Sequence, residues 1–195
     1  MNVAKGDDTR QTILSHAFAL AKAVGVTGLS IGRLAEDTGL SKSGLFAHFG
    51  SKEALEVAVV DEASRLFVEE VVVPALREPR GEPRVRAMFD RWAAWGKRPG
   101  GCFFVGASAE LDDRSGPPRE RLVQAIRDWV DALATAAKIA VTERHFRADL
   151  DIEQFAFDLY GIMVGSHTFA RFLHDPATDS RTHDAFERLL ASARR

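Results

Sequence analysis

The sequence of 195 residues is poor in cysteine and in long apolar runs, and each shortage excludes a class of protein. A single cysteine, Cys102, permits no internal disulfide and is typical of a chain that stays in a reducing compartment. No apolar run approaches the ~18 residues that a membrane-spanning helix needs. The opening stretch MNVAKGDDTR lacks the apolar segment of a secretory signal. We therefore expect a cytoplasmic protein that makes no contact with a membrane.

Strand signals are also scarce, because runs that alternate β-branched and polar residues are missing. Apolar residues instead recur at helical spacing, and glycine and proline separate the repeats. The expected helices span about residues 8–24, a short stretch after Ser30, and residues 41–48, 51–75, 83–97, 102–111, 117–146, 151–174 and 178–193. We predict an all-α fold with an N-terminal three-helix head (1–52) and a larger helical body (53–195).

The net charge of −2 is unevenly distributed along the chain. Residues 1–52 carry six lysines and arginines against four acidic residues, whereas the remainder carries 20 against 24. A mildly basic head on an acidic body is a weak indication of nucleic-acid binding, because basic clusters more often only solvate a surface. The positions of the basic residues are therefore more informative than their number.

The stretch SKSGLFAHFGSKEAL, residues 41–55, twice places a lysine directly after a serine at a helix start. Lys42 follows Ser41, and Lys52 follows Ser51. A helix N-terminus carries partial positive charge, so a lysine there opposes local stability unless an anion binds. Either lysine alone is as easily an ordinary surface charge. The pair favours the phosphate backbone of DNA as the anion.

Two short helices joined by a tight glycine-containing turn, behind a longer first helix, are typical of a helix-turn-helix. In the second short helix, Leu45 and Phe49 share the inward face, whereas Ser43 and Ala47 point away. The outward face also includes Gly44, Phe46 and His48. Such a face of small and aromatic residues suits a helix that enters the major groove of DNA.

Residues 9–55 closely resemble the DNA-binding head of the TetR (tetracycline repressor) family. The matching stretches are TRQTIL, GVTGLS, LAEDTGLSKSGLFAHF and SKEAL, within about a quarter of the chain. The body resembles the family only in length and helix order. The resemblance implies a ligand-responsive transcriptional regulator, most simply a repressor, because an operator-bound dimer blocks polymerase without further contacts. The predicted DNA-binding residues are Arg10, Ser30, Arg33, Ser41, Lys42, Ser43, Gly44, Phe46, His48 and Lys52.

Two positions depart from the family pattern. Phe46 stands where many members carry tyrosine, so a hydrogen bond from a phenol to a phosphate is not available. Gly32 replaces a side chain that is often polar, which leaves Arg33 as the expected DNA contact from the preceding helix.

Large apolar side chains are concentrated in the body, where a ligand sensor needs a mainly apolar cavity. For any single residue, plain core is the alternative interpretation, but Trp92 and Trp95 with Phe103 favour a pocket wall around the PGG turn. Tyr160, the only tyrosine, is the candidate polar group of the pocket. The residues predicted to bind a small apolar or aromatic effector are Met88, Trp92, Trp95, Phe103, Phe104, Trp129, Phe155, Tyr160 and Met163.

The helix expected from residue 151 is apolar on more than one side, which indicates burial on both sides. In a body of this size we expect another copy of the chain to cover the second side of this helix. The family resemblance implies the same, a four-helix seam built from the last two helices of each protomer. The predicted interface residues are Phe157, Gly161, Val164, Gly165, Phe169, Phe172, Phe186, Leu189 and Leu190. A two-fold homodimer would present two recognition helices to successive major grooves of a near-palindromic operator.

An enzyme is the least favoured interpretation. No nucleophile motif surrounds Cys102, and His167 and His174 have no carboxylate at metal-ligand spacing. We therefore predict no catalytic residue, no metal and no cofactor. A DNA-binding regulator controlled by a protein partner, or by no effector, stays open as the alternative to a ligand sensor.

Overall fold

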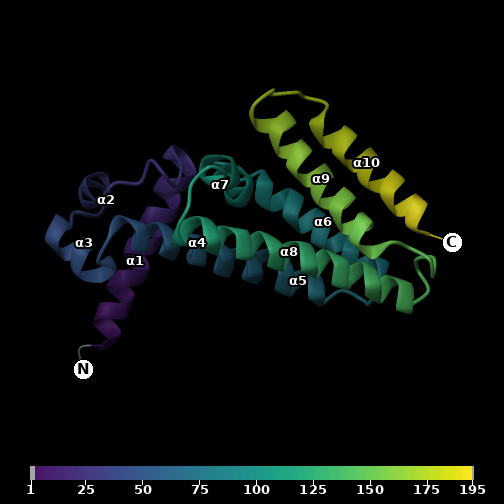
Figure 1. Cartoon of the computed structure of the whole chain (residues 1–195), viewed down its shortest axis with the longest axis horizontal. Helices are drawn as coiled ribbons and strands as arrows, with labels where there is room; N and C mark the ends of the chain where they lie inside the picture. The colour runs from purple at the N-terminus through teal and green to yellow at the C-terminus, as the bar shows by residue number, and fades with distance from the viewer. Residues whose placement is uncertain (1–2, 195) are drawn as a thin grey trace. The chain divides into compact units, whose positions relative to one another are not determined.

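The computed structural model describes residues 3–194, with side chains from residue 9 onward, and in this range it contains helices and no strand (Figure 1). The all-α prediction is therefore confirmed. The helices are α1 (Val3–Val24), α2 (Ile31–Thr38), α3 (Lys42–Phe49), α4 (Lys52–Phe67), the π-helical turn η1 (Val68–Val72), α5 (Val73–Leu76), α6 (Glu82–Gly96), α7 (Phe103–Leu111), α8 (Pro117–Thr142), α9 (Ile152–Arg171) and α10 (Thr178–Ala193).

Most helix bounds agree with the sequence prediction, but α1 begins at Val3 and not near residue 8, and α9 ends at Arg171 and not near residue 174. A further difference, at the end of α8, has a local cause. α8 ends at Thr142 and not near residue 146. Arg144 adopts a φ of 62°, and the N–H of Phe146 turns back to the carbonyl of Ala140 at 3.1 Å. This left-handed ending satisfies a carbonyl of the last helical turn and releases the chain into the following loop.

The segment predicted as one helix over 51–75 is helical to Leu76 but changes type on the way. In η1 the helix widens, and the N–H of Val73 donates to the carbonyl of Val68, five residues earlier. Pro74 follows directly; it has no N–H, and its ring excludes the ordinary bond to the carbonyl four residues before it. The helix therefore passes the proline by adopting a wide turn, which is rare in helices.

The chain divides into two compact units. The head unit consists of residues 1–66 and 103–125, and the body unit consists of residues 67–102 and 126–195. The head unit thus contains most of α4, the whole of α7 and the first part of α8 in addition to the helices of the predicted head, although all three lie within the sequence assigned to the body. Among the described residues, no helix has the length and apolar character needed to cross a membrane.

The core of the head unit is built from all of its first four helices and the loop after α1. Its buried side chains include Ile13, Leu14, Ala17, Val26, Leu29, Leu34, Leu45, Phe49, Leu55 and Val59. α7 adds Phe103, whose ring meets that of Phe18 edge-on at 5.5 Å. The burial of Leu45 and Phe49 confirms the predicted inward face of the second short helix.

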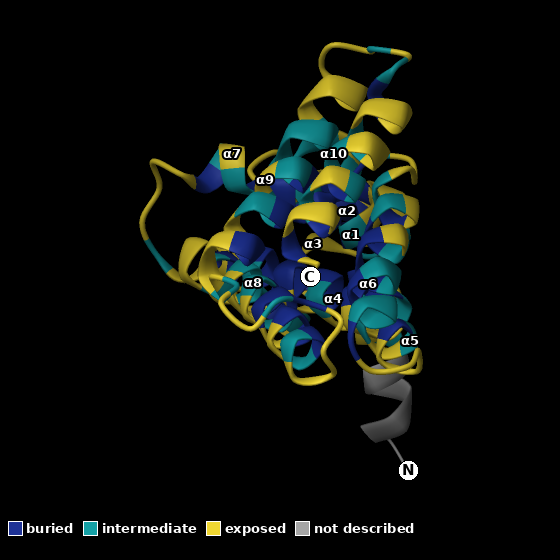
Figure 2. Cartoon of the chain, turned by 90° about the vertical axis from the view of Figure 1, so that its right-hand side faces the viewer, coloured by how far each residue is buried: buried dark blue, intermediate teal, exposed yellow. Residues whose placement is uncertain are grey.

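Aromatic contacts dominate the core of the body unit. Phe67 lies edge-on to Trp95 at 5.6 Å and to Trp129 at 4.9 Å. Phe89 of α6 stacks on Phe186 of α10 with a centroid distance of 3.8 Å and an angle of 14°. Figure 2 shows the result on α10, which is buried along one side and exposed along the other.

Two residues predicted for the dimer interface belong to this core. Phe186 is 1% exposed and Leu190 is 0% exposed within a single chain, because α10 turns both toward the interior of the body unit. They are therefore core residues of the protomer and not part of its surface. Leu189, between them on the helix, is half-buried.

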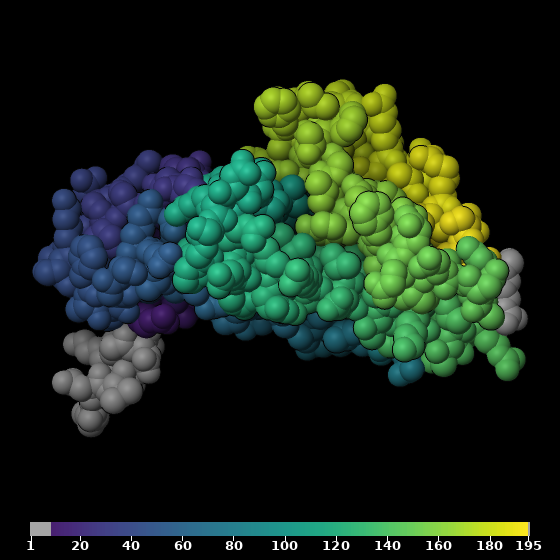
Figure 3. Space-filling model, in the orientation of Figure 1, coloured from purple at the N-terminus to yellow at the C-terminus, as the bar shows by residue number. Residues whose placement is uncertain are grey.

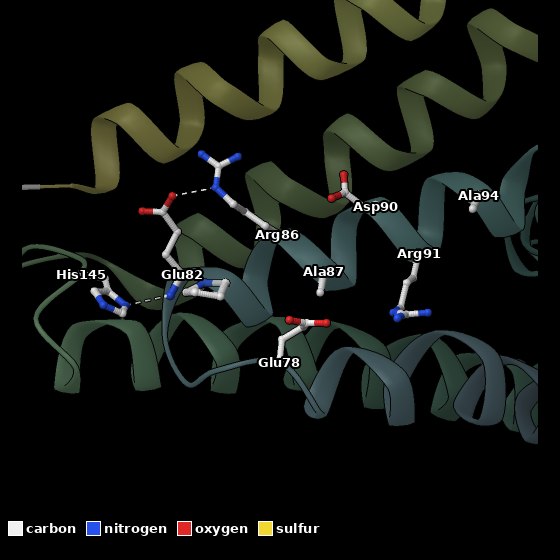
Figure 4. A pocket seen from close by; sticks show the side chains of 9 residues that line it. Glu78, Glu82, Arg86, Ala87, Asp90, Arg91, Ala94 and His145 are labelled. Atoms are coloured by element: carbon white, nitrogen blue, oxygen red, sulfur yellow. Dashed lines mark hydrogen bonds and ion pairs between the residues drawn. The ribbon is translucent and has the colours of Figure 1, made fainter.

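A network of ion pairs ties α6 to α10. Glu82 accepts hydrogen bonds from Arg86 at 2.8 Å and from Arg194 at 2.9 Å, and Arg86 also donates to Glu187 at 2.9 Å. Figure 4 shows Glu82 and Arg86 facing each other on α6. The hydrogen bond from Arg194, followed by that from Arg86, outweighs burial and lowers the pKa of Glu82 from 4.5 to about 2.

The substitution Glu82→Gln should lower the stability of the protein at pH 7, and this deficit should shrink in acid. The pKa of Glu82 is lower in the folded state, so its ionised form stabilises the fold above about pH 4.5 and loses that contribution as the pH falls toward about 2. The thermal unfolding midpoints of variant and wild type, measured between pH 7 and pH 3, test this pH dependence. Glu120→Gln, at an exposed position of α8, is the control. A deficit that does not change with pH would contradict the assignment.

Candidate nucleic-acid interface

Both short helices of the head begin at a serine whose hydroxyl caps the helix. The N–H of Arg33 donates to Ser30 Oγ at 3.2 Å, and the N–H of Gly44 donates to Ser41 Oγ at 3.1 Å. Such caps satisfy amide groups that have no partner inside the helix. Gly39 ends α2 with a φ of 68°, a left-handed conformation that glycine adopts without strain. Local signals in the sequence therefore fix the bounds of α2 and α3 and the tight turn between them.

α3 presents a face to solvent that matches the predicted recognition face. Phe46 is 49% exposed, and Ser43 and Ala47 are exposed beside it. Gly44 and His48 are half-buried at its margins. The side chains on this face are short apart from Phe46 and His48, so the backbone of α3 can approach the floor of a groove closely.

The two helix-start lysines have different surroundings. Lys52 donates to the carbonyl oxygen of Thr27 at 2.9 Å and lies 3.6 Å from the carboxylate of Glu56. Lys42 is exposed, and its ammonium lies 3.7 Å from the place that a β-carbon on Gly32 would take. No ion pair is described for Lys42 in the part of the chain with defined side chains. Lys42 can therefore bind an anion directly, whereas Lys52 would first have to give up its hydrogen bond to the carbonyl of Thr27.

The two predicted arginines lie at other exposed positions of the head. The Arg10 guanidinium lies 5.4 Å from the ring centroid of Phe49, a cation–π distance that holds it near the end of α3. Arg33 is exposed on α2. Both side chains are thus accessible on the surface of the head, and their contact with DNA stays a prediction.

The nine predicted effector-binding residues are divided between the two units. Phe103 and Phe104 lie on α7 of the head unit. The others lie in the body unit, where Met88, Trp92, Trp95, Trp129, Phe155 and Met163 are buried. Tyr160 is half-buried, and burial, with a smaller effect of Cys102, raises its pKa to about 12. Tyr160 is thus a neutral hydroxyl group at neutral pH.

Two tryptophans of the body carry polar atoms without a partner. The indole N–H groups of Trp95 and Trp129 are buried, and among the described residues neither has a hydrogen-bond acceptor. Both rings lie edge-on to Phe67. Leaving a buried donor without an acceptor costs about 1–3 kcal/mol. A water oxygen or an oxygen of a bound molecule next to either indole would therefore stabilise the body unit.

The hollows described in the body unit are lined mainly by other residues. One of about 190 Å³ has Trp92 in its wall, together with Phe89, Gly96, His167 and Arg171. Another, of about 710 Å³, is an open groove along α6 whose sides include the charged or polar residues Glu78, Glu82, Arg86, Asp90, Arg91 and His145 (Figure 4). Of the nine residues predicted to bind an effector, Trp92 is the one that lines one of these described hollows.

The surface of α9 carries large apolar side chains in contact with solvent. Phe157 is 71% exposed, Phe169 is 44% exposed and Phe172 is 82% exposed. Gly161 and Gly165 have open space where a β-carbon would stand. α9 and α10 lie side by side at the surface (Figure 3), and a hollow of about 190 Å³ on this pair is lined by Ile162, Gly165, Phe169 and Ala185.

Sequence reasoning missed one pair of residues that the fold brings together. The N–H and the hydroxyl of Thr27 both donate to Glu110 Oε2, at 3.0 and 3.1 Å. The two residues are 83 positions apart, and although Thr27 lies within the stretch GVTGLS, nothing in that stretch indicates Glu110 as its partner. No local pattern in the sequence could have indicated the contact.

Comparison with known sequences gives the same family for both parts of the chain. Residues 13–59 match the sequence model described as "Bacterial regulatory proteins, tetR family". Residues 81–186, more than half of the chain, match the one described as "Tetracyclin repressor-like, C-terminal domain". The head and the body are thus matched independently.

Individual proteins agree with these matches. The HTH-type transcriptional repressor AcnR of Corynebacterium efficiens is 39% identical over 74 residues, which span 36% of this chain and 39% of that protein. A TetR transcriptional regulator from Chloroflexus aurantiacus superposes with a TM-score of 0.86 at 27% identity, over 97% of this chain and 96% of its own. AibR, solved with isovaleryl coenzyme A and operator DNA, shares the fold with a TM-score of 0.73 at 23% identity, over 94% and 98%.

Proposed function

Because the chain belongs to the TetR family of bacterial regulatory proteins, we propose that it represses transcription by binding a near-palindromic DNA operator as a homodimer. A small apolar or aromatic effector releases it from that operator. The observation that carries the proposal is the exposed face of α3, which begins at a capped N-terminus with Lys42 exposed beside it. A helix N-terminus and a lysine together form a favourable site for a phosphate group.

The recognition face and the anion site have separate tasks. Contacts to phosphates fix the position of a protein on the duplex, whereas contacts to base edges select the sequence. Lys42 and the α3 amides are placed for the first task, and Ser43, Gly44 and Phe46 for the second. Because Phe46 has no hydroxyl, its contribution is an apolar contact, of the kind that a thymine methyl group offers.

Binding to an operator selected from a random duplex pool should weaken steeply with salt, and Lys42→Ala should reduce that dependence. If the dimer neutralises about six phosphates, the slope of log K against log salt is roughly −5. Loss of one phosphate contact in each subunit makes the slope shallower by roughly two, with base preference unchanged. Fluorescence anisotropy over a salt series measures both quantities.

Lys138→Ala, a change of the same charge on the exposed side of α8, is the matched control and should leave the slope unaltered. Equal slopes for Lys42→Ala and wild type would remove Lys42 from the phosphate contacts. Failure of the wild type to enrich any duplex sequence would overturn DNA recognition itself.

The homodimer is proposed from the apolar surface of α9. Phe157, Phe169 and Phe172 are exposed on a single chain, and an apolar surface of this kind is favoured when another surface covers it. Gly161 and Gly165 allow a second helix backbone to approach. The adjacent hollow beside Phe169 offers space for a side chain of the second copy. A two-fold arrangement of this surface would place one head on each half of a palindromic operator.

Phe169→Glu should convert the dimer to monomers and abolish operator binding while helicity is kept. A buried, unpaired carboxylate at the seam costs several kcal/mol, so the dimer dissociates. Sedimentation velocity at micromolar concentration measures the association state. Leu76→Glu, at a comparably exposed apolar position on α5, should leave the dimer intact. A wild type that sediments as a monomer would refute the two-half-site mechanism.

The effector is proposed from the polar atoms in the aromatic core of the body. The partnerless indole N–H groups of Trp95 and Trp129 favour a ligand that combines an aromatic or apolar frame with hydrogen-bond acceptors. The neutral hydroxyl of Tyr160 is a further candidate contact. Control by a protein partner, or the absence of an effector, is the alternative function.

An effector found in a panel of small aromatic acids and esters should bind the DNA-free protein more tightly than the operator complex. A ~100-fold preference corresponds to about 2.7 kcal/mol, and reciprocity requires the operator to weaken effector binding by the same factor. Tryptophan fluorescence reports the binding, because all three tryptophans lie in the body unit. A bound compound with equal affinity for both forms is not a releasing effector, and a panel without any binder would favour the alternative.

A further inference from the structure

Thr27, in the loop between α1 and α2, has all of its polar groups bonded to side chains from distant helices. Its N–H and its hydroxyl donate to Glu110 of α7, and its carbonyl accepts from Lys52 of α4. These three bonds range from 2.9 to 3.1 Å. A loop residue is normally bonded to water or to its own neighbours, so this arrangement fixes the loop from two sides.

The backbone of the same loop is shaped to admit the Glu110 carboxylate. Gly25 has a φ of 85°, and a β-carbon there would lie 2.5 Å from Glu110 Oε2. Any other residue would be strained and would displace the carboxylate. Val26 and Leu29, on either side of Thr27, are each only 1% exposed and are anchored in the core of the head unit. We call Thr27, Glu110 and Lys52 the loop clamp.

The clamp acts on the start of the helix-turn-helix. Ser30, the cap of α2, follows Thr27 by three residues, and Leu29 bonds back to the carbonyl of Val26 at 3.2 Å. A fixed Thr27 therefore fixes the N-terminus of α2, on which α3 packs. On the other side, α7 is packed on α1 through Phe103 and Phe18 (Figure 1). Glu110 thus joins the position of α7 to the position of α2.

We infer that Glu110 is a positioning residue, which holds the helix-turn-helix in its DNA-binding orientation by bonding Thr27. The consequence of this inference is that operator affinity depends on the position of α7, and this consequence rests on the proposed function. α7 follows Gly100 and Gly101, two consecutive residues with φ of 87° and 72°, and these mark the crossing from the body unit into the head unit. A displacement of α7 would break the Glu110 bonds and release the loop.

Three variants separate positioning from charge and from folding. Glu110→Ala removes both bonds, whereas Glu110→Gln loses the charge but keeps an oxygen that accepts both hydrogen bonds. Glu120→Ala, at an exposed site on α8 in the same unit, makes the same charge change as Glu110→Ala and is the matched control. Thr27→Val removes only the hydroxyl bond and keeps the shape of the side chain.

The first measurement is hydrogen–deuterium exchange of backbone amides in the DNA-free protein. Glu110→Ala should raise exchange about tenfold, both at Thr27 and along α2, because the loop no longer fixes the helix. Glu110→Gln and Glu120→Ala should stay within about threefold of wild type. An increase confined to the Thr27 amide would mean that only a local bond was lost, and the inference would be wrong.

The second measurement is the affinity for a duplex selected by the wild-type protein. Glu110→Ala should weaken binding about tenfold, because the competent orientation is populated less, while Glu110→Gln restores it and Glu120→Ala leaves it unchanged. Equal weakening by Glu110→Gln and Glu110→Ala would assign the effect to charge and overturn the inference.

Thr27→Val keeps the inference testable if Glu110→Ala does not fold, because on its own it should weaken binding about threefold, and unchanged binding would contradict the clamp. Where Glu110→Ala folds, Thr27→Val should have no further effect in that background, as expected for residues that share an interaction. Additive effects would contradict the clamp. If the wild type selects no duplex, the proposed function fails, and the exchange comparison alone decides whether the clamp exists.

Discussion

α2 and α3 are eight residues long, and helices of this length do not persist in water without support from tertiary packing. Their stability depends on the burial of Leu34, Leu45 and Phe49 in the core of the head unit, where α2 packs on α1 and α3 packs on α2. Every inward position of the two helices is committed to that core, and only the outward positions are free to vary. The exposed face of α3 is therefore the part of the head that can be specialised for recognition without a cost in folding.

The head was predictable from sequence because its determinants are local. Ser30, Ser41 and Gly39 mark helix ends within a few residues of their effect, and the spacing of Leu45 and Phe49 defines a helix face. What the sequence could not indicate is the environment of a charge. Lys42 and Lys52 follow the same sequence pattern, yet Lys52 is bonded to Thr27, 25 residues away, and Lys42 is not. Hydrogen bonds between residues this far apart in the sequence arise only from the packing of whole helices.

The body was less predictable for a related reason. Helical spacing indicated that α9 is apolar on more than one side, but it could not say which apolar residues of α9 and α10 are covered by the chain itself. Phe186 is taken into the core by its stacking on Phe89, whereas Phe172 stays in solvent. The aromatic residues predicted as a pocket wall are nearly all buried, and burial in one chain does not by itself separate a cavity wall from a packed core. The partnerless indoles of Trp95 and Trp129 are the feature that makes a binding role physically reasonable there.

The wide π-helical turn before Pro74 reduces the drift of one long apolar stripe around the helical segment from α4 to α5. The buried residues of that stripe recur every four positions, at Leu55, Val59, Ala63, Phe67, Val71 and Ala75. In a regular α-helix each residue turns about 100°, so a stripe with a period of four drifts about 40° at every step. Over five steps the drift would be about 200°, enough to carry the stripe to the opposite side. A turn that holds more residues than usual takes back part of this rotation, so a four-residue apolar period over a long helix is kept closer to one side where the helix contains such a turn.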